Sequence, residues 1–321
     1  TTLSEAMLYR SGAIRKLGRV DHKDAFLDTD TLEKARGITI FSKQALLTAG
    51  NTDITLLDTP GHVDFSTETE RTLQVLDYAV LVVSGTDGVQ SHTETLWRLL
   101  RRYHVPTFVF VNKMDLPGKS REELLAQLNH RLGEGFVAFD VPQADRDEAL
   151  ALCDENLMDR MLDAGQLTDA DIIPAVARRH VFPCWFGSAL RRTENDALES
   201  VDALLDGIDR YTRPAPALDA FGAKVFKVSQ DEQGTRLTWL RVTGGELKVK
   251  AQLSGEADGE PWEEKANQLR LYSGVKYTLA EAIGPGQVCA VTGLTKARPG
   301  EGLGAERDSD VPVLEPVLSY Q

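Results

Sequence analysis

Two short segments carry residue types suited to nucleotide chemistry. Residues 58–62 (Asp-Thr-Pro-Gly-His) follow one apolar run, and residues 112–115 (Asn-Lys-Met-Asp) follow another. A carboxylate such as Asp58, placed where a buried strand ends, can hold Mg²⁺ through water, because this ion keeps much of its hydration shell. Gly61 has no side chain, so its backbone N–H can approach a terminal phosphate closely. The first segment therefore predicts a loop that senses the metal ion and the last phosphate of a nucleotide, although its residue types would also suit a plain turn.

The second segment predicts which base the nucleotide carries. An ionised Asp115 can accept two N–H bonds from guanine that adenine cannot donate, so a wrong base leaves a charged acceptor unpaired and can lose ~10⁴-fold in discrimination. Asn112 is expected to tie neighbouring loops together, and the stem of Lys113 to pack along the base. A loop after a further apolar run is expected to close over the guanine carbonyl: Ser188, Ala189 and Leu190. The two segments in this order predict a GTPase.

His62 is the candidate catalytic residue. It occupies the position at which GTPases place the residue that orients the attacking water. Because this chemistry depends mainly on positioning, we interpret the imidazole as a water-positioning group rather than a strong base. Upstream, residues 36–40 (Arg-Gly-Ile-Thr-Ile) place Thr39 where it could bind Mg²⁺ and sense the terminal phosphate. The alternative for that segment is an arginine-tipped turn entering a strand.

The glycine-rich loop that usually cradles the phosphates, Gly-x-x-x-x-Gly-Lys-Ser/Thr, does not occur in this sequence. A helix-like run lies directly behind Thr1 and Thr2, as expected for residues that follow the lysine of such a loop. We infer that the loop and the first strand are absent from the sequence, so that the chain alone binds nucleotide poorly. Thr1 is then the hydroxyl ligand of Mg²⁺, and Thr2 belongs to the nucleotide site. A Gly-Lys pair directly before Thr1 would reject the alternative of a non-hydrolysing GTP-binding scaffold.

The pattern of apolar residues predicts the fold around these loops. The runs at 79–83 and 107–111 are continuous rather than alternating, which is typical of parallel strands covered by helices on both faces. A third strand is expected at 53–57. Helical patterns fall between and after the strands, at 67–76, 91–103 and 197–211. This alternation predicts a doubly wound α/β domain of the P-loop GTPase type over residues 1–213.

A change in composition marks a second domain. After the stiff Pro-Ala-Pro linker, short β-like segments are broken by glycines, so residues 217–307 are predicted to form a compact antiparallel β-barrel. The expected strands are 223–228, 237–242, 246–253, 268–271 and 287–291. Residues 308–321 are expected to begin a third domain that is missing.

Within the first domain, Ser91 and Ser120 each open a Ser-x-x-Glu capping box that predicts a helix start.

Composition narrows the possible partners and compartment. The net charge of −13 argues against wrapping nucleic acid through the overall field of the protein, so no DNA partner is expected. No apolar stretch reaches the ~18 residues that a membrane span needs, so no membrane partner is expected. The first residues lack a signal pattern, which predicts the cytoplasm. We also expect a monomer. Cys153, Cys184 and Cys289 are too widely spaced to indicate a metal or disulfide framework, and they are interpreted as reduced and structural.

Several phrases together resemble the translational GTPases. They are residues 8–14 (Leu-Tyr-Arg-Ser-Gly-Ala-Ile), 17–21 (Leu-Gly-Arg-Val-Asp), 36–40, 58–65 and 112–115. The Ser-Gly-Ala-Ile and Leu-Gly-x-Val-Asp phrases are most similar to the tetracycline-resistance ribosomal protection proteins, which are relatives of elongation factor G. Phe226-Lys227 and residues 240–247 also resemble the β-barrel second domain of these factors.

The resemblance implies a function and a further subdomain. It implies GTP or GDP and Mg²⁺ as ligands, and the ribosome, with its RNA and proteins, as the partner that stimulates hydrolysis. The stretch between the base-reading loop and Ser188 is longer than one strand and one helix require. The resemblance accounts for it as an inserted helical subdomain at about 117–180, shorter than that of elongation factor G. The alternatives are a translocation, release or housekeeping translation factor, or the non-hydrolysing scaffold.

Overall fold

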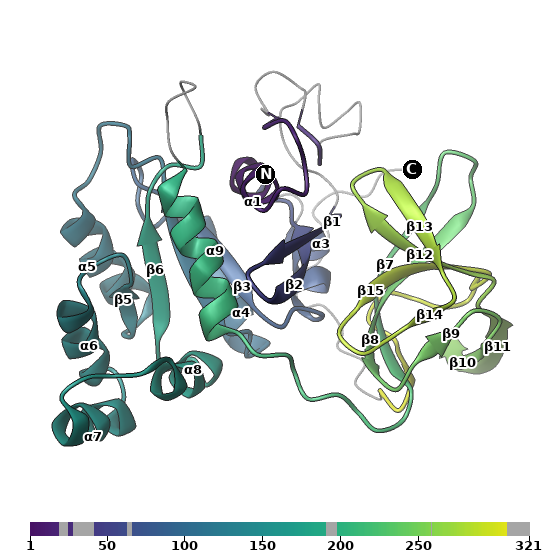
Figure 1. The fold of residues 1–321 in the computed structure, drawn as a ribbon. Helices are drawn as coiled ribbons and strands as arrows, with labels where there is room; N and C mark the ends of the chain where they lie inside the picture. The colour runs from purple at the N-terminus through teal and green to yellow at the C-terminus, as the bar shows by residue number, and fades with distance from the viewer. Residues whose placement is uncertain (19–24, 28–41, 63–65, 191–197, 258, 307–321) are drawn as a thin grey trace.

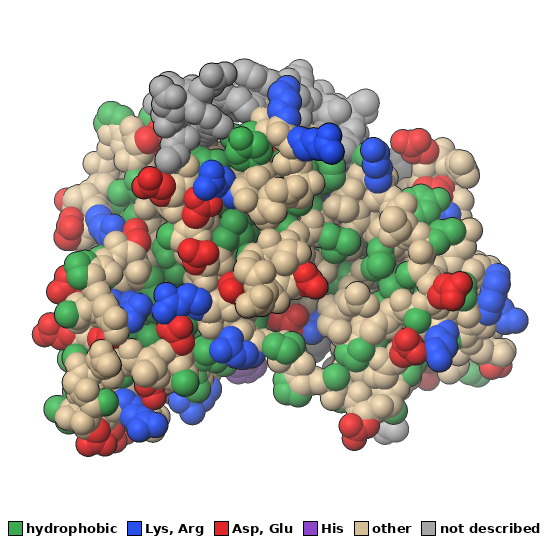
Figure 2. Space-filling model, in the orientation of Figure 1, with side chains coloured by type: hydrophobic (Ala, Val, Ile, Leu, Met, Phe, Trp, Pro, Cys, Tyr) green, Lys and Arg blue, Asp and Glu red, His purple; other side chains and the backbone are tan. Residues whose placement is uncertain are grey.

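The computed structural model describes residues 1–18, 25–27, 42–62, 66–190, 198–257 and 259–306. The chain forms an α/β domain, running from α1 to α9, and a barrel domain, running from β7 to β16, which lie side by side (Figure 1). Within this part of the chain, every helix is too short or too polar to cross a bilayer. Basic and acidic side chains are interspersed over both domains on the face shown in Figure 2.

The centre of the α/β domain is a parallel sheet. Its strands lie in the order β3 (Ala79–Ser84), β4 (Thr107–Asn112), β6 (Phe182–Phe186) and β5 (Phe136–Ala138). The two predicted apolar runs are β3 and β4, and the fully buried side chains of β4 explain why its sequence does not alternate.

Helices cover both faces of this sheet, as its buried strands require. Phe108 and Phe110 of β4 face α1 (Thr2–Arg10) and α9 (Glu199–Tyr211) in one apolar core. The alternate residues of β4, Val109 and Val111, face the other core, which is built from one side of three helices: α3 (Ser66–Leu73), α4 (Ser91–Arg102) and α5 (Arg121–Leu132). The predicted doubly wound fold is therefore confirmed.

An antiparallel hairpin borders the α/β domain next to the barrel domain. It consists of β1 (Lys43–Ala49) and β2 (Thr52–Asp58), paired from Lys43↔Asp58 to Ala49↔Thr52. The sequence predicted β2 but not β1. Asp209 of α9 fixes the turn, because its Oδ1 accepts hydrogen bonds from the Thr52 hydroxyl at 2.7 Å and from the Asn51 amide at 3.0 Å. The last residue of β2 is Asp58, so this hairpin delivers the first predicted site loop.

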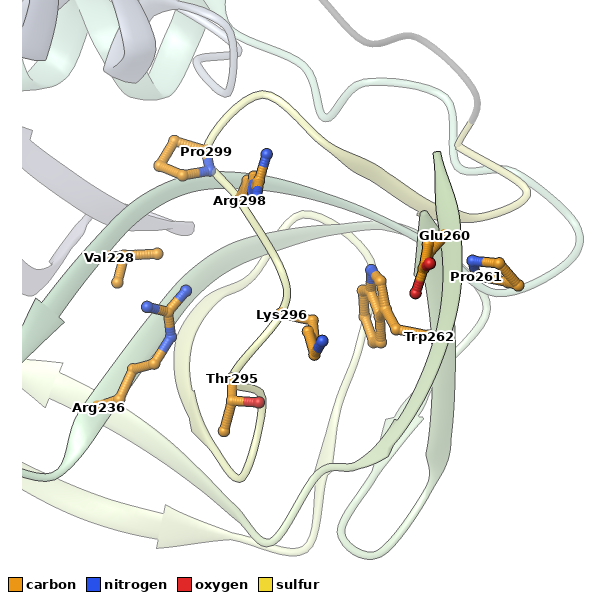
Figure 3. A pocket seen from close by; sticks show the side chains of 9 residues that line it. All are labelled: Val228, Arg236, Glu260, Pro261, Trp262, Thr295, Lys296, Arg298 and Pro299. Carbon is orange, nitrogen blue, oxygen red and sulfur yellow. The ribbon is translucent and has the colours of Figure 1, made fainter. Parts of the chain in front are cut away.

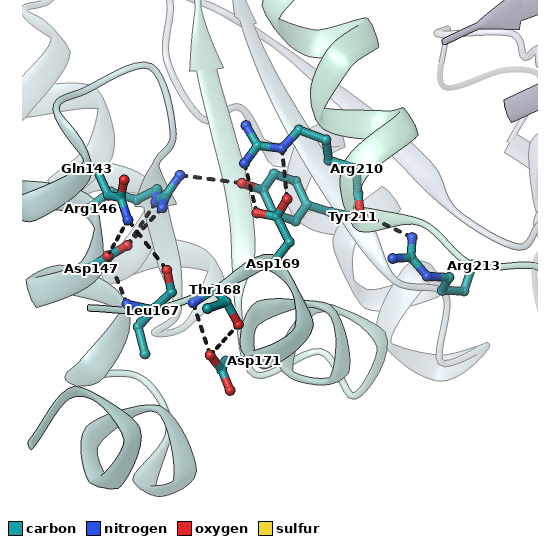
Figure 4. Close-up of polar contacts among 10 residues, drawn as sticks. All are labelled: Gln143, Arg146, Asp147, Leu167, Thr168, Asp169, Asp171, Arg210, Tyr211 and Arg213. Atoms are coloured by element: carbon teal, nitrogen blue, oxygen red, sulfur yellow. Dashed lines mark hydrogen bonds and ion pairs between the residues drawn. The ribbon is translucent and has the colours of Figure 1, made fainter. Parts of the chain in front are cut away.

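Between residues 117 and 180 the chain is mostly helical. After α5 and β5 come α6 (Gln143–Ala151), α7 (Glu155–Ala164) and α8 (Asp169–Ala177). Figure 4 shows polar contacts around α6 and α8; Arg210 of α9 pairs with Asp169 of α8 at 2.9 Å through two nitrogens. Buried Asp147 accepts from Arg146 and from the Leu167 amide. The bounds of the insertion stay a prediction, because β5 belongs to the main sheet.

The barrel domain is antiparallel and rich in strands, as predicted. Its largest sheet has the order β13-β12-β15-β8-β7-β16, with two-stranded sheets β10–β11 and β9–β14 beside it. The strand bounds are β7 (Gly222–Gln230), β8 (Arg236–Gly244), β9 (Leu247–Lys248), β10 (Gln252–Ala257), β11 (Glu260–Lys265), β12 (Gln268–Ser273), β13 (Lys276–Ala280), β14 (Ala282–Ile283), β15 (Val288–Thr292) and β16 (Gly302–Gly304).

Two local predictions were wrong. The expected strand 246–253 is divided into β9 and β10, because Lys250 has φ 68° and the Ala251 amide donates to the Lys248 carbonyl in a turn at 3.1 Å. The helix expected from Ser91 does begin there, but the capping box predicted for Ser91 and Glu94 is wrong: Gln90 is the N-cap, and the Gln90 amide donates to the Thr93 hydroxyl at 3.3 Å. By contrast, the reciprocal capping box of Ser120 and Glu123 is confirmed, with bonds of 2.8 and 3.2 Å. All three cysteines are free thiols.

Candidate functional site

The predicted metal-binding residues Thr1 and Asp58 are in direct contact. The Thr1 hydroxyl donates to Asp58 Oδ2 at 2.7 Å, and the Ser4 hydroxyl donates to Asp58 Oδ1 at the same distance. Asp58 is 8% exposed, so these bonds offset the cost of burying its carboxylate. The start of α1 and the end of β2 are thereby joined at one point, which is the edge at which α/β folds bind ligands.

The donor atoms at this point suit Mg²⁺. Hydroxyl and carboxylate oxygens are hard ligands, and an ionised carboxylate keeps lone pairs free beyond the two that Thr1 and Ser4 engage. The third predicted ligand, Thr39, lies outside the described residues. Among the residues described, groups of three or more His, Cys, Asp or Glu side chains that could hold a metal ion do not occur. The pair fits an ion that takes only one or two ligands from the protein and the rest from phosphate and water.

A cavity of about 640 Å³ lies beside this pair. Its walls include consecutive residues of β2 and of β3, which belong to different sheets, together with the first turn of α1. The predicted site residues that line it are Thr1, Thr2, Asp58, Gly61, His62 and Asn112. Gly61 and His62 are exposed, so the predicted water-positioning residue lies at an accessible edge of the cavity.

The predicted base-reading loops are tied to each other by Asn112. Its Oδ1 accepts hydrogen bonds from the Lys113 amide at 2.8 Å and from the Ala189 amide at 2.9 Å. A second bond, from the Met114 amide to the Gly187 carbonyl at 3.1 Å, runs alongside. Lys113 has φ 66°, a left-handed conformation that is uncommon outside glycine and fits a sharply turned loop. The loops of β4 and β6 therefore form one unit.

The exposed residues of these loops complete the predicted base site. Asp115 and Lys113 are exposed, as residues that meet a ligand must be. The Ser188 hydroxyl lies 3.3 Å from the Leu190 amide, which donates to it and so shapes the second loop. The 640 Å³ cavity is lined by Asn112 but not by the other predicted base-site residues, which are Lys113, Asp115, Ser188, Ala189 and Leu190. Asn112 therefore belongs both to the cavity and to the base-reading loops.

Sequence reasoning missed three residues near the site. Ser4 bonds Asp58, and its position one helical turn after Thr1 is a signal that could have found it. Lys119 Nζ donates to the Asp87 carbonyl at 3.1 Å, which joins the β3 loop to the base-reading loop. His92 was not among the predicted site residues, yet its pKa is lowered by burial and by the nearby His62. The last two contacts carry no local sequence signal.

A second cavity, of about 710 Å³, opens in the barrel domain (Figure 3). Arg236 lies on its wall but is already engaged, since its guanidinium donates to the carbonyls of Leu294 and Ala297 at 3.1 and 2.7 Å. Trp262 donates to Glu301 at 3.1 Å. None of the predicted site residues that the structure describes lines this cavity. These contacts hold the loop after β15 in place.

The fold and these loops define a class of protein: a doubly wound α/β domain with the loop arrangement of guanine-nucleotide-binding proteins, followed by an antiparallel barrel domain. A sequence profile of the elongation factor Tu GTP binding domain matches residues 1–214. The chain belongs to this family. The resemblance to translational GTPases is therefore confirmed.

Individual relatives agree with this assignment. Tetracycline resistance protein TetM of Streptomyces lividans is 34% identical over 99% of this chain and 53% of its own length. Elongation factor G of Ureaplasma urealyticum serovar 10 is 29% identical over 99% of this chain and 56% of its own. A crystal structure of a protein from Thermus thermophilus superposes with a TM-score of 0.81 at 27% identity, over 98% of this chain and 54% of that one. The chain spans about half the length of the curated relatives it matches.

Proposed function

We propose that this protein is a ribosome-dependent GTPase of the tetracycline-resistance ribosomal protection type. The observation that carries the proposal is a pair of contacts at the carboxyl ends of the strands, one in each predicted part of the nucleotide site. Thr1 bonds Asp58 at the end of β2, and Asn112 bonds the Ala189 amide at the end of β4. Because the chain belongs to a family defined by a GTP binding domain, we take GTP as the ligand of this site.

Each predicted residue then has a role toward GTP or GDP. Thr1, Thr39 and Asp58 would hold Mg²⁺, which neutralises charge on the phosphates when it is bound. Gly61 offers its amide to the terminal phosphate, and His62 orients the attacking water. Asp115 accepts from guanine, while Asn112, Lys113 and the Ser188–Leu190 loop frame the base.

Stimulation by the ribosome completes the proposed cycle. A positive group supplied by a partner can accelerate GTP hydrolysis by about 10³–10⁵-fold. We propose that ribosomal RNA and proteins supply this group, align His62, and release the factor after hydrolysis. In this proposal the protein acts as a monomer in the cytoplasm, without a DNA or membrane partner.

The role of His62 is tested with His62→Ala in the protein carrying its natural flanking sequence. We expect unchanged GTP affinity and a loss of ribosome-stimulated turnover, because the imidazole acts on water rather than on the bound nucleotide. The measurement is phosphate release with purified ribosomes, with His130→Ala as a control, since His130 is exposed on α5 away from the cavity. Equal turnover by His62→Ala and the parent protein would contradict the assignment.

The cellular role is tested in a purified translation system stalled by tetracycline. Rescue that requires His62 would support ribosomal protection driven by GTP hydrolysis. The relatives named elongation factor G support a second candidate, a factor acting at translocation or another step of translation. Intact ribosome-stimulated hydrolysis without rescue would favour this second candidate. Bound GTP without any hydrolysis would favour the scaffold.

A further inference from the structure

The barrel domain packs against α3, the helix that follows the loop carrying His62. Helix α3 begins shortly after His62, and α3 and β7 are packed against each other. Where the chain leaves α3, Val75 is buried in a small apolar cluster with Phe226 of β7 and Val288 of β15. Any displacement of α3 must therefore disturb a packed interface with the barrel domain.

Lys227, a buried cation of the barrel domain, contacts two segments of the α/β domain. Lys227 of β7 is 9% exposed, and its Nζ donates to the Ser42 carbonyl at 2.7 Å. The same ammonium lies 3.7 Å from Glu68 Oε1 on α3, and 5.6 Å from the ring centroid of Trp239 on β8. The position of Lys227 is thus fixed from three sides.

The environment of Glu68 explains why the charge is needed. Its Oε1 is buried and makes no hydrogen bond within the described part of the chain, so the ammonium of Lys227 is the group that offsets its burial. Removing one partner of a buried pair leaves the other charge uncompensated. An apolar residue at position 227 would therefore release α3 rather than merely thin the packing.

Ser42 links the start of β1 to α3 by a hydrogen bond between side chains. Its hydroxyl and that of Thr72 on α3 are 2.8 Å apart and buried. Ser42 leads into β1 and lies three positions after Thr39, the predicted phosphate-sensing residue. In the segment that follows α3, Asp77 pairs with Arg241 of β8 at 2.5 Å. Cations of the barrel domain thus pair with the first turn of α3 and with the segment after its end, and Lys227 also holds Ser42 at the entry to β1.

We propose that Lys227 is a positioning residue for GTP hydrolysis: it couples the barrel domain to the helix that follows His62 and to the segment that follows Thr39. This inference rests on the proposed function. Its consequence is that a partner which moves the barrel domain changes the alignment of His62 without contacting the nucleotide. A misplacement of about 1 Å at a reacting group can cost about 10²-fold in rate.

The test compares Lys227→Met with Lys227→Arg in the protein carrying its natural flanking sequence. Methionine keeps the length of the side chain but removes the charge, so we expect ribosome-stimulated kcat to fall about 10- to 100-fold with KM for GTP and GDP affinity unchanged. Arginine keeps a cation and should restore most of the turnover. Glu68→Gln combined with Lys227→Met should lose no more turnover than Lys227→Met alone, because both remove one interaction.

Arg236→Met is the matched control for damage to the barrel domain. Arg236 is a partly buried cation of β8 whose hydrogen bonds to described residues go to barrel carbonyls, so its loss weakens the barrel without releasing α3. A second readout, amide hydrogen exchange of α3 and β1, needs no nucleotide. We expect faster exchange there in Lys227→Met and not in Arg236→Met.

Each outcome decides between coupling and general destabilisation. Equal loss of turnover in Lys227→Met and Arg236→Met would overturn the proposal, as would parent-like turnover and exchange in Lys227→Met. If the parent protein itself does not hydrolyse GTP, the proposed function fails. Hydrogen exchange would still show in that case whether Lys227 holds α3.

Discussion

His92 shows how one side chain near the site can make stability depend on pH. Its Nε2 is buried and has no hydrogen-bond partner among the described residues. Burial, and secondarily the charge of His62, lower the pKa of His92 below its ordinary value of 6.5. Since the unfolded chain then binds more protons than the folded one, stability is lost as pH falls from about 6.5 through the folded pKa.

The corresponding prediction concerns His92→Gln, which removes the titrating group and keeps a polar side chain. We expect the variant to gain stability relative to the parent as pH falls from 8 to 5, with most of the difference appearing below about 6.5. The measurement is the free energy of unfolding in urea at each pH. His104→Gln serves as a control on an exposed histidine beyond the end of α4. Parallel pH profiles for parent and His92→Gln would contradict the prediction.

At the scale of an element, α9 is held against the sheet by a close approach at Gly207. A Cβ at this position would lie 2.2 Å from Cζ2 of Trp185 on β6. Alanine has a higher helix propensity than glycine, by about 1 kcal/mol, but the clash opposes this gain. The predicted result for Gly207→Ala is a net loss of about 1–3 kcal/mol in the free energy of unfolding, the usual cost of overpacking a core.

Two variants separate packing from propensity at this helix. Asp206→Ala changes the neighbouring exposed position, so it should leave stability unchanged or raise it slightly. Trp185→Phe shortens the ring that opposes Gly207, so adding it to Gly207→Ala should recover part of the loss. A Gly207→Ala protein as stable as the parent would show that the indole shifts at little cost.

The sequence predicted elements whose signal is local and left out those whose signal is not. The loops at Asp58 and Asn112 follow strands, so motif and apolar run together placed them. Strand β1 was missed because its residues alternate only partly and its pairing with β2 carries no motif. The contact from Lys227 to Ser42 joins residues 185 positions apart, and such pairs leave no trace in one sequence.

Whole-molecule behaviour should follow from the apolar cluster between the domains. Phe226 is 2% exposed and packs with Val75 and Val288, which are 3% and 4% exposed. Interfaces between domains often permit independent motion, but this one buries Phe226 close to the ion pairs of Lys227 and Arg241. We therefore expect residues 1–321 to melt in a single calorimetric transition.

Phe226→Ala should divide that transition in two. The substitution removes the ring that the two domains share and costs about 3–5 kcal/mol, so the barrel domain should melt first and the α/β domain later. Phe226→Leu, which keeps most of the apolar volume, should retain one transition. Two transitions in the parent protein would mean that the domains are already independent. A single, merely shifted transition in Phe226→Ala would mean that the polar contacts of Lys227 and Arg241 suffice to couple them.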